Sequence, residues 1–201
     1  MALSTFAVTY DYRCPFARNA HEHLVVALRA GAPWEVEFAP FSLSQAHVEE
    51  GGTSVWDDPA KASHLLAMEA GLVVRDTNPD RFLAVHLGLF AARHDQGRDL
   101  RDEDVVRDVL AAAGADADGV LSVVANGGPR QAFRKAHEAA VDMHRVFGVP
   151  TFIVGDRAVF VRLMTRPESD SVRARSTIDR VLTLTTEQPD LNEFKHTTID
   201  R

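Results

Sequence analysis

The sequence predicts an α/β fold in which a small mixed β-sheet is interrupted by an all-helical domain. Two strand-like segments, 6–10 and 34–38, flank a helical segment near the N-terminus, which gives a β-α-β unit. Two further strand-like segments and a helix close the chain, and five helical segments lie between these halves. The predicted order is therefore β-α-β, five helices, and β-β-α.

The N-terminal unit is defined by alternation and by turn residues. Apolar side chains alternate along 6–10, and a helix is predicted from Pro15 to about Ala30, since proline suits the first helical position. The Gly31-Ala32-Pro33 turn then leads into the second strand, 34–38. A helix between two strands favours parallel pairing with a right-handed crossover. The segment from Pro40 to Gly52 is expected to be irregular.

The middle of the chain has helical periodicity. Apolar residues recur every three or four positions, as in Phe82, Val85, His86, Leu89 and Phe90. The predicted helices span about 59–71, 79–95, 102–113, 117–126 and 129–147. In the third of them, the apolar stripe consists of Val105, Val106, Val109 and Leu110.

The C-terminal segment returns to strands. Residues 148–154 and 158–163 are predicted strands joined by a hairpin turn at Gly155-Asp156-Arg157, and a last helix is expected from about Pro167 to Thr185. Residues 1–53 and 147–201 are therefore predicted to form one domain, with the helical domain, 54–146, inserted in it.

Composition limits the class of protein. The chain has 201 residues, a net charge of −7 and a pI near 5.7, which argues against nucleic acid or an anionic membrane as the main partner. No apolar run reaches the roughly 20 residues of a membrane span. The N-terminus has no basic segment that would suggest a secretory signal, so a cytoplasmic location is predicted. A single cysteine excludes an intramolecular disulfide.

That cysteine, Cys14, occupies the predicted turn between the first strand and the first helix. The free N–H groups and the positive dipole at a helix N-terminus favour an anion, and Arg13 and Arg18 add positive charge. A reactive thiol with a lowered pKa is therefore predicted. The alternative is a buried, inert cysteine, because free cysteines are among the most buried residues.

Two motifs resemble the DsbA-like family. Cys14-Pro15-Phe16-Ala17 resembles its Cys-Pro-x-Cys helix start, and Gly148-Val149-Pro150-Thr151-Phe152 resembles its Val-Pro-Thr loop, whose proline is cis and faces the active cysteine. Pro40-Phe41-Ser42-Leu43 resembles the segment after the second strand in the cytoplasmic branch, which includes FrnE-like proteins and the 2-hydroxychromene-2-carboxylate isomerases. The resemblance implies a thioredoxin-like fold (βαβ…ββα) with the helical domain inserted in the middle.

The chain departs from the family pattern at Ala17, where the dithiol members carry their resolving cysteine. We therefore expect a thiol-disulfide oxidoreductase that acts in a monothiol mode, with an external small thiol completing turnover. One alternative is a glutathione- or other thiol-dependent isomerase or transferase, although that branch generally carries serine where Cys14 stands. The other is a non-catalytic ligand binder on the same fold.

The expected site centres on Cys14 as nucleophile. The resemblance implies that Val149 presents its backbone to an extended thiol-bearing ligand and that a cis Pro150 holds that loop. Helical spacing places Arg18 and His21 on the side of Cys14, where either would contact an acidic ligand or be an ordinary solvated or packed residue. The residues expected to bind the substrate or the thiol are Val149, Pro150, Thr151, Arg18, Pro15, Phe16 and Tyr12.

No bound cofactor and no metal are expected. The chain has nine histidines, but their spacings do not bring two ligands of one ion together on a helix. A low-molecular-weight thiol is expected as cosubstrate. The expected partners are a small thiol, a thiol-conjugated substrate or a protein disulfide, and the single cysteine is compatible with an oligomer.

Overall fold

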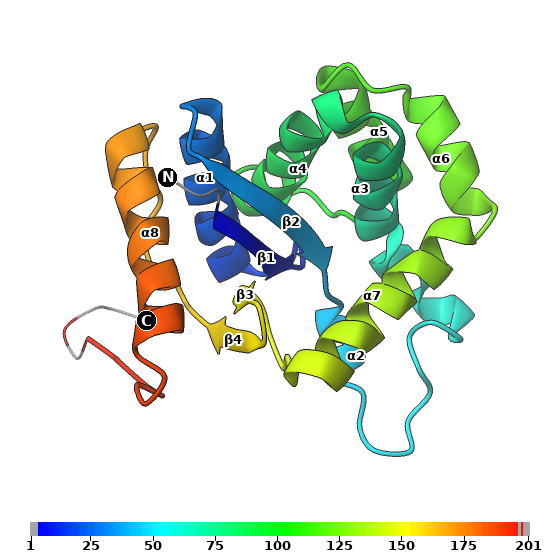
Figure 1. Cartoon of the computed structure of the whole chain (residues 1–201). Helices are drawn as coiled ribbons and strands as arrows, with labels where there is room; N and C mark the ends of the chain where they lie inside the picture. Colours follow the sequence, from blue (N-terminus) through cyan, green and yellow to red (C-terminus); the bar gives the residue numbers. More distant parts are fainter. Residues whose placement is uncertain (1–3, 197, 199–201) are drawn as a thin grey trace.

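Four strands form one mixed sheet in the computed structural model, which describes residues 4–196 and residue 198 (Figure 1). The strands β1 (Ser4–Tyr10), β2 (Trp34–Pro40), β3 (Thr151–Val154) and β4 (Arg157–Phe160) lie in the order β2-β1-β3-β4. β1 pairs with β2 in parallel, and the other two pairings are antiparallel. The predicted mixed sheet and its parallel β-α-β unit are confirmed.

Two helices, one from each end of the chain, pack against the sheet. α1 (Pro15–Arg29) and α8 (Ser171–Glu187) pack side by side in Figure 1 and enclose a core with the sheet. Phe6 and Phe152 from the strands, Leu24 from α1 and Ile178 from α8 are buried in this core. The helices are held by apolar burial, which contributes about 25 cal/mol per Å².

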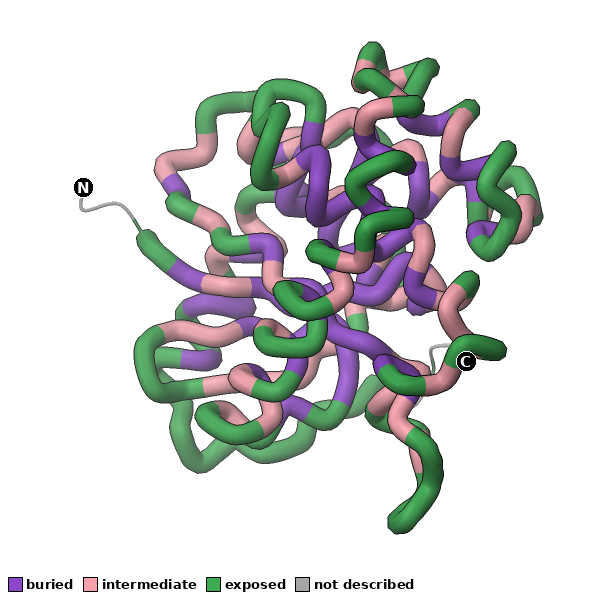
Figure 2. Tube along the Cα trace, turned by 90° about the vertical axis from the view of Figure 1, so that its right-hand side faces the viewer, coloured by how far each residue is buried: buried purple, intermediate pink, exposed green. Residues whose placement is uncertain are grey.

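The helical insertion lies between β2 and β3. It contains a 3₁₀ turn, η1 (Pro59–His64), followed by α3 (Leu66–Thr77), α4 (Pro79–His94), α5 (Glu103–Ala112), α6 (Ala117–Ala125) and α7 (Gly128–His144). The apolar stripes predicted for α4 and α5 are buried, as expected. One core runs from Tyr10 and Phe38 into these helices, and the buried stretches in Figure 2 follow it through the centre of the molecule. None of the helices within residues 4–196 is long and apolar enough to cross a membrane.

The domain limits at 53/54 and 146/147 stay a prediction. The first predicted domain also includes residues 1–3, 197 and 199–201, which lie outside the described residues. Cys14 belongs to the same buried cluster as side chains of the insertion, including Phe90 of α4. The insertion contacts the loop that carries the cysteine, because His94 Nε2 lies 2.9 Å from the Tyr12 carbonyl oxygen.

The helix predicted for 59–71 is wrong in its limits. Residues 59–64 form the 3₁₀ turn η1, and α3 continues past Gly71 to Thr77. Gly71 does not end the helix because it is buried against the Tyr12 ring: a Cβ at this position would lie 2.5 Å from the Tyr12 hydroxyl. Glycine is required there by close packing, which outweighs its low helix propensity.

Other parts of the chain also differ from the prediction. A short helix, α2 (Leu43–Ala46), occupies part of the segment expected to be irregular, with Ser42 as its N-cap. The strands β3 and β4 are shorter than 148–154 and 158–163. α8 begins at Ser171 rather than near Pro167, because Glu168 and Ser169 have φ values of 52° and 68°, which no right-handed helix accommodates.

Candidate active site

Cys14 is the N-cap residue of α1. Its backbone is extended, with φ −92° and ψ 119°, and Pro15 occupies the start of the helix as predicted. The Ala17 N–H donates to Cys14 Sγ at 3.4 Å, and the Cys14 N–H donates to the Asp11 carbonyl at 3.0 Å. The sulfur thus takes the place of the oxygen that usually caps a helix.

The Val149–Pro150 loop faces this sulfur. Cys14 Sγ donates to the Val149 carbonyl oxygen at 3.3 Å, and the Val149–Pro150 peptide bond is cis. Thr151 holds the loop, because its N–H donates to Thr9 Oγ1 and its hydroxyl donates to the Gly148 carbonyl, both at 2.8 Å. The structure therefore places the loop of Val149, Pro150 and Thr151 against Cys14, and the role of these residues in binding a substrate or thiol stays a prediction.

The thiol is not the activated group that its helix position suggested. Cys14 is 7% exposed, and burial raises the pKa of its thiol, because the charged form loses water. The N–H groups of Ala17 and Phe16 lower that pKa, but by less than burial raises it. The expectation of a lowered pKa is therefore contradicted for the protein without a ligand.

Phe16 forms part of a partly exposed aromatic surface beside the thiol. The Arg162 guanidinium lies 5.5 Å from the centre of the Phe16 ring and 5.9 Å from that of Phe160. Phe160 in turn contacts Phe147, whose side chain is exposed. Pro15, next to Phe16, is exposed as well. Sequence reasoning missed Arg162, Phe147 and Phe160, since only the folded chain brings these distant residues close to Phe16.

Tyr12 is buried, and its hydroxyl begins a chain of hydrogen bonds. Tyr12 Oη lies 3.0 Å from His86 Nδ1, His86 Nε2 lies 2.9 Å from His21 Nδ1, and His21 Nε2 lies 3.2 Å from the Thr9 carbonyl. Because a carbonyl only accepts, His21 donates from Nε2, His86 donates from Nε2 to His21, and Tyr12 donates to His86. His21 therefore supports the packing between α1 and α4 and does not contact the thiol.

The chain of hydrogen bonds contains two uncharged imidazoles. Burial lowers the pKa of His21 to about 3. Burial and the neighbouring His21 lower the pKa of His86 well below its usual value. The network is therefore a rigid polar link inside the shared core, with Phe90 and Phe38 packed around it.

Arg18 is used in ion pairs within the protein. Its guanidinium pairs with Glu22 on α1 at 3.3 Å and with Asp95 at the end of α4. Arg166 contacts the same two carboxylates. Arg18 is thus placed between α1 and α4 in ion pairs and is not the solvated charge that was the alternative from the sequence.

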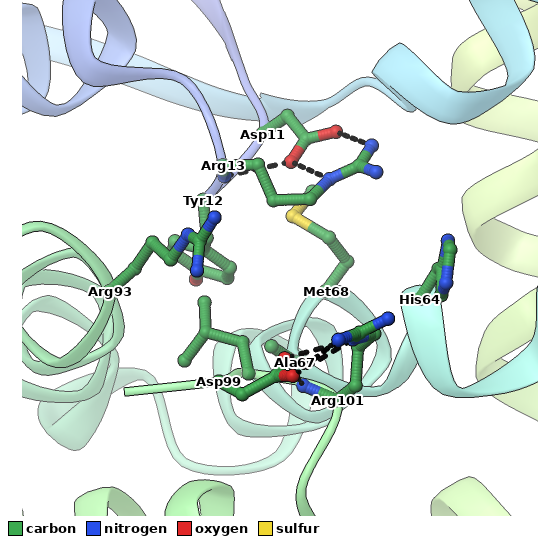
Figure 3. Close-up of a pocket in the computed structure, with 10 residues that line it drawn as sticks. Asp11, Tyr12, Arg13, His64, Ala67, Met68, Arg93, Asp99 and Arg101 are labelled. Atoms are coloured by element: carbon green, nitrogen blue, oxygen red, sulfur yellow. Dashed lines mark hydrogen bonds and ion pairs between the residues drawn. The ribbon is translucent and has the colours of Figure 1, made fainter. Parts of the chain in front are cut away.

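A cavity of about 300 Å³ opens next to the loop that carries the cysteine (Figure 3). Tyr12 and Arg13 line it, but Cys14 does not. Asp11, buried at 2% exposure, holds Arg13 through a 2.7 Å ion pair and accepts from the Leu43 N–H at 2.9 Å. Asp11 was not recognised from the sequence, because its partner on α2 is distant in the chain.

Metal ligation finds no support in the described part of the chain, where no three histidine, cysteine, aspartate or glutamate side chains come together in a suitable arrangement. His21 and His86 are adjacent, but both ring nitrogens of each already have partners. That the protein works without a metal stays a prediction.

Comparison with known families gives one match over most of the chain. A family model described as a DSBA-like thioredoxin domain matches residues 6–165. This range includes the sheet, the Cys14 turn, the Val149–Pro150 loop and the whole insertion. No curated protein matches the chain.

Solved structures with the same fold include both oxidoreductases and an isomerase. A 2-hydroxychromene-2-carboxylate isomerase is 17% identical with a TM-score of 0.64, and the match covers 94% of this chain and 100% of the isomerase. The cytosolic disulfide reductase DsbM from Pseudomonas aeruginosa is 16% identical with a TM-score of 0.60, covering 90% of this chain and 99% of DsbM. Pseudomonas aeruginosa DsbA is 21% identical with a TM-score of 0.53, and the match covers 91% of this chain and 86% of DsbA. The predicted thioredoxin-like fold with a helical insertion is confirmed.

Proposed function

The chain belongs to the family of DSBA-like thioredoxin domains, and from this premise we propose that it is a thiol-disulfide oxidoreductase that works through Cys14 in a monothiol mode. The observation that carries the proposal is the 3.3 Å contact between Cys14 Sγ and the Val149 carbonyl next to the cis Pro150, in a chain without a second cysteine. Ala17 occupies the position of a resolving cysteine, so the second thiol must come from outside the chain.

In the first step, Cys14 attacks a disulfide R–S–S–R′. The thiolate forms a Cys14–S–S–R bond, the substrate S–S bond breaks, and R′–S⁻ leaves and takes up a proton. The Ala17 N–H, 3.4 Å from Sγ, stabilises the Cys14 thiolate before the attack. Phe16 and Arg162 border the sulfur and offer an apolar and cationic surface to the substrate.

The raised pKa of Cys14 is compatible with this step if substrate binding removes the hydrogen bond that the S–H donates. In the free protein burial raises the pKa of the thiol, and the S–H donates to the Val149 carbonyl, a hydrogen bond that only the protonated form makes. A substrate whose own N–H donates to this carbonyl takes away the acceptor of the S–H. The sulfur then keeps only the Ala17 N–H, which favours the anion. Binding would thereby activate the nucleophile.

The second step needs a small thiol, R″–SH. Its thiolate attacks the R sulfur of the mixed disulfide, the R–S–S–R″ bond forms, and Cys14 leaves and is protonated again. The net reaction is R–S–S–R′ + R″–SH → R–S–S–R″ + R′–SH, so no other oxidant or reductant is required. The substrate is a small or thiol-conjugated disulfide or a protein disulfide, in agreement with the sequence-based expectation.

The test follows the covalent intermediate by mass. The protein is incubated with oxidised glutathione, and the expected product is a single adduct on Cys14 that disappears when a reducing thiol is added. Cys14→Ser is expected to form no adduct and to have no turnover. Cys14→Ser with full turnover of disulfide substrates would exclude the mechanism.

A second candidate is a thiol-dependent isomerase. The buried, protonated state of Cys14 favours it, because a thiol that remains protonated orients a bound small thiol instead of attacking a disulfide. A glutathione-dependent activity that survives Cys14→Ser, without any Cys14 adduct, would select this candidate.

We further propose a cytoplasmic location, which the cytosolic disulfide reductase among the similar structures supports by analogy. A single cysteine whose mixed disulfide is released by a small thiol suits a reducing compartment. Fractionation of cells that produce the protein, with a secreted and a cytoplasmic marker as controls, tests this location.

A further inference from the structure

The cavity beside the Cys14 loop lies where the sheet end of the fold meets the helical insertion. Its wall is contributed by the β1–α1 loop, η1, α3, α4 and the segment after α4 (Figure 3). Its volume of about 300 Å³ lies at the lower end of the range for small-molecule sites. Tyr12, Met68 and Leu100 give it an apolar wall.

Three arginines surround this apolar wall. In Figure 3, Arg13, Arg93 and Arg101 approach the cavity from different sides, with Met68 between them. Asp11 pairs with Arg13 at 2.7 Å, and Asp99 pairs with Arg101 at 2.6 Å. Arg93, which is exposed, makes no ion pair or side-chain hydrogen bond with any residue that the structure describes.

The charges of the cavity leave one guanidinium available. Two carboxylates offset two arginines, so Arg93 gives the cavity a positive charge in a chain whose net charge is −7. An arginine with free N–H donors binds a carboxylate through two parallel hydrogen bonds. Asp11 and Asp99 oppose a second negative charge on the same ligand, which favours a carboxylate over a phosphate ester.

We propose that this cavity binds an organic acid with an apolar body: its carboxylate pairs with Arg93, and its body packs against Tyr12, Met68 and Leu100. The site is separate from the thiol chemistry, because Cys14 does not line the cavity. It is nevertheless adjacent to that chemistry, since Tyr12 and Arg13 directly precede Cys14 in the chain. The inference does not depend on the reaction proposed for Cys14.

The test measures binding of two matched probes, 3-phenylpropionate and 3-phenylpropanamide, by NMR titration of the full-length protein. The acid is expected to bind saturably and at least about tenfold more tightly than the neutral amide, as expected for a charged hydrogen-bonded pair. The backbone signals of Tyr12, Arg13, Met68 and Leu100 are expected to shift. Binding is expected to be unchanged in Cys14→Ser.

Arg93→Gln is the decisive variant, and Arg81→Gln is its control. Both arginines are exposed residues of α4, but Arg81 does not line the cavity. Arg93→Gln is expected to weaken binding of the acid by at least about tenfold and to leave the affinity for the amide unchanged. Arg81→Gln is expected to change neither affinity.

Four results would overturn the inference. These are equal affinity for the acid and the amide, no effect of Arg93→Gln on the acid, shifts confined to residues outside the cavity, and tighter binding of phenyl phosphate than of the acid. Failure of Cys14 to form a mixed disulfide would overturn only the proposed reaction, so the two conclusions fail separately.

Discussion

The sulfur of Cys14 lies 3.3 Å from the carbonyl oxygen of Val149, 135 positions further along the chain. The two residues meet because β3 pairs antiparallel with β1 and brings the Val149–Pro150 loop to the turn before α1. This contact places the thiol opposite a backbone group that a substrate is able to use, while burial raises the pKa of the thiol.

Alkylation of Cys14 is expected to be slow at neutral pH in the free protein. Burial raises the pKa of this thiol, so the midpoint of the alkylation rate against pH should lie above the ordinary thiol value of about 8.5. The rate with iodoacetamide, measured by mass, gives the midpoint. The protein unfolded in urea is the control and should give a lower midpoint. A folded-state midpoint well below about 8.5 would contradict the raised pKa.

Ala17→Cys is expected to convert the protein to a dithiol. Ala17 occupies the turn of α1 that faces Cys14, and its N–H already contacts Cys14 Sγ at 3.4 Å. A thiol at this position should resolve the mixed disulfide within the chain, so the glutathione adduct no longer accumulates and an internal disulfide forms. Mass measurement before and after alkylation distinguishes the two products.

The control for this experiment is Ala20→Cys, which lies on the same helix and is also buried. It is six positions from Cys14, further than the spacing of the family motif, and should leave the adduct intact. Accumulation of the adduct at the wild-type level in Ala17→Cys would contradict the proposed geometry.

Tyr12→Phe is expected to destabilise the fold by about 1–3 kcal/mol. The change removes the donor to His86 Nδ1 and leaves a buried acceptor without a partner. Tyr10→Phe is a matched control, since Tyr10 is equally buried but its hydroxyl makes no hydrogen bond to His86 or His21. Urea denaturation should therefore separate the two variants, and equal losses in both would contradict the hydrogen-bond chain.

Gly71→Ala is expected to destabilise the fold by about 1–3 kcal/mol through overpacking. The added Cβ would lie 2.5 Å from the hydroxyl of Tyr12, which the link to His86 holds in place. Gly128→Ala is the control, because nothing lies within 4 Å of its added Cβ and it is a helix residue without a positive φ. The control should be neutral or slightly stabilising, as for other helix glycines. Thermal unfolding of both variants tests the difference.

Stability is expected to fall in mild acid because His21 and His86 are buried without charge. Burial lowers the pKa of His21 to about 3, whereas the unfolded chain takes up a proton near pH 6.5. The contribution of the uncharged His21 to the free energy of unfolding is fully present above about pH 6.5 and decreases by about 1.4 kcal/mol per pH unit as the pH falls toward 3. His86 acts in the same direction, because burial and His21 lower its pKa too. Urea denaturation between pH 7 and pH 4.5 measures the slope.

The same pair gives a spectroscopic check. NMR of imidazole nitrogens should identify His21 and His86 as neutral Nε2–H tautomers throughout this pH range. A proton on either Nδ1 atom would contradict the direction of the hydrogen bonds assigned here.

Local sequence patterns were sufficient to predict most helices and strands and the candidate thiol. Alternation in 6–10 and helical spacing in α4 and α5 are repeated along neighbouring residues, so one stretch of sequence contains the whole signal. The Cys14-Pro15 turn is also local, because the proline and the cap belong to one helix start. Gly71 was misjudged because its reason, the Tyr12 ring, lies elsewhere in the chain.

What the sequence by itself determined is the α/β order and the single thiol at the start of a helix, with an alanine and no second cysteine three positions later. Only the tertiary structure decided the ionisation of Cys14, the pairing of Arg18 with Glu22 and Asp95, and the cavity with Arg93. The physical reason is that helix starts and apolar periods depend on neighbours in sequence. Burial and charge pairing depend on which distant segments the folded core brings together.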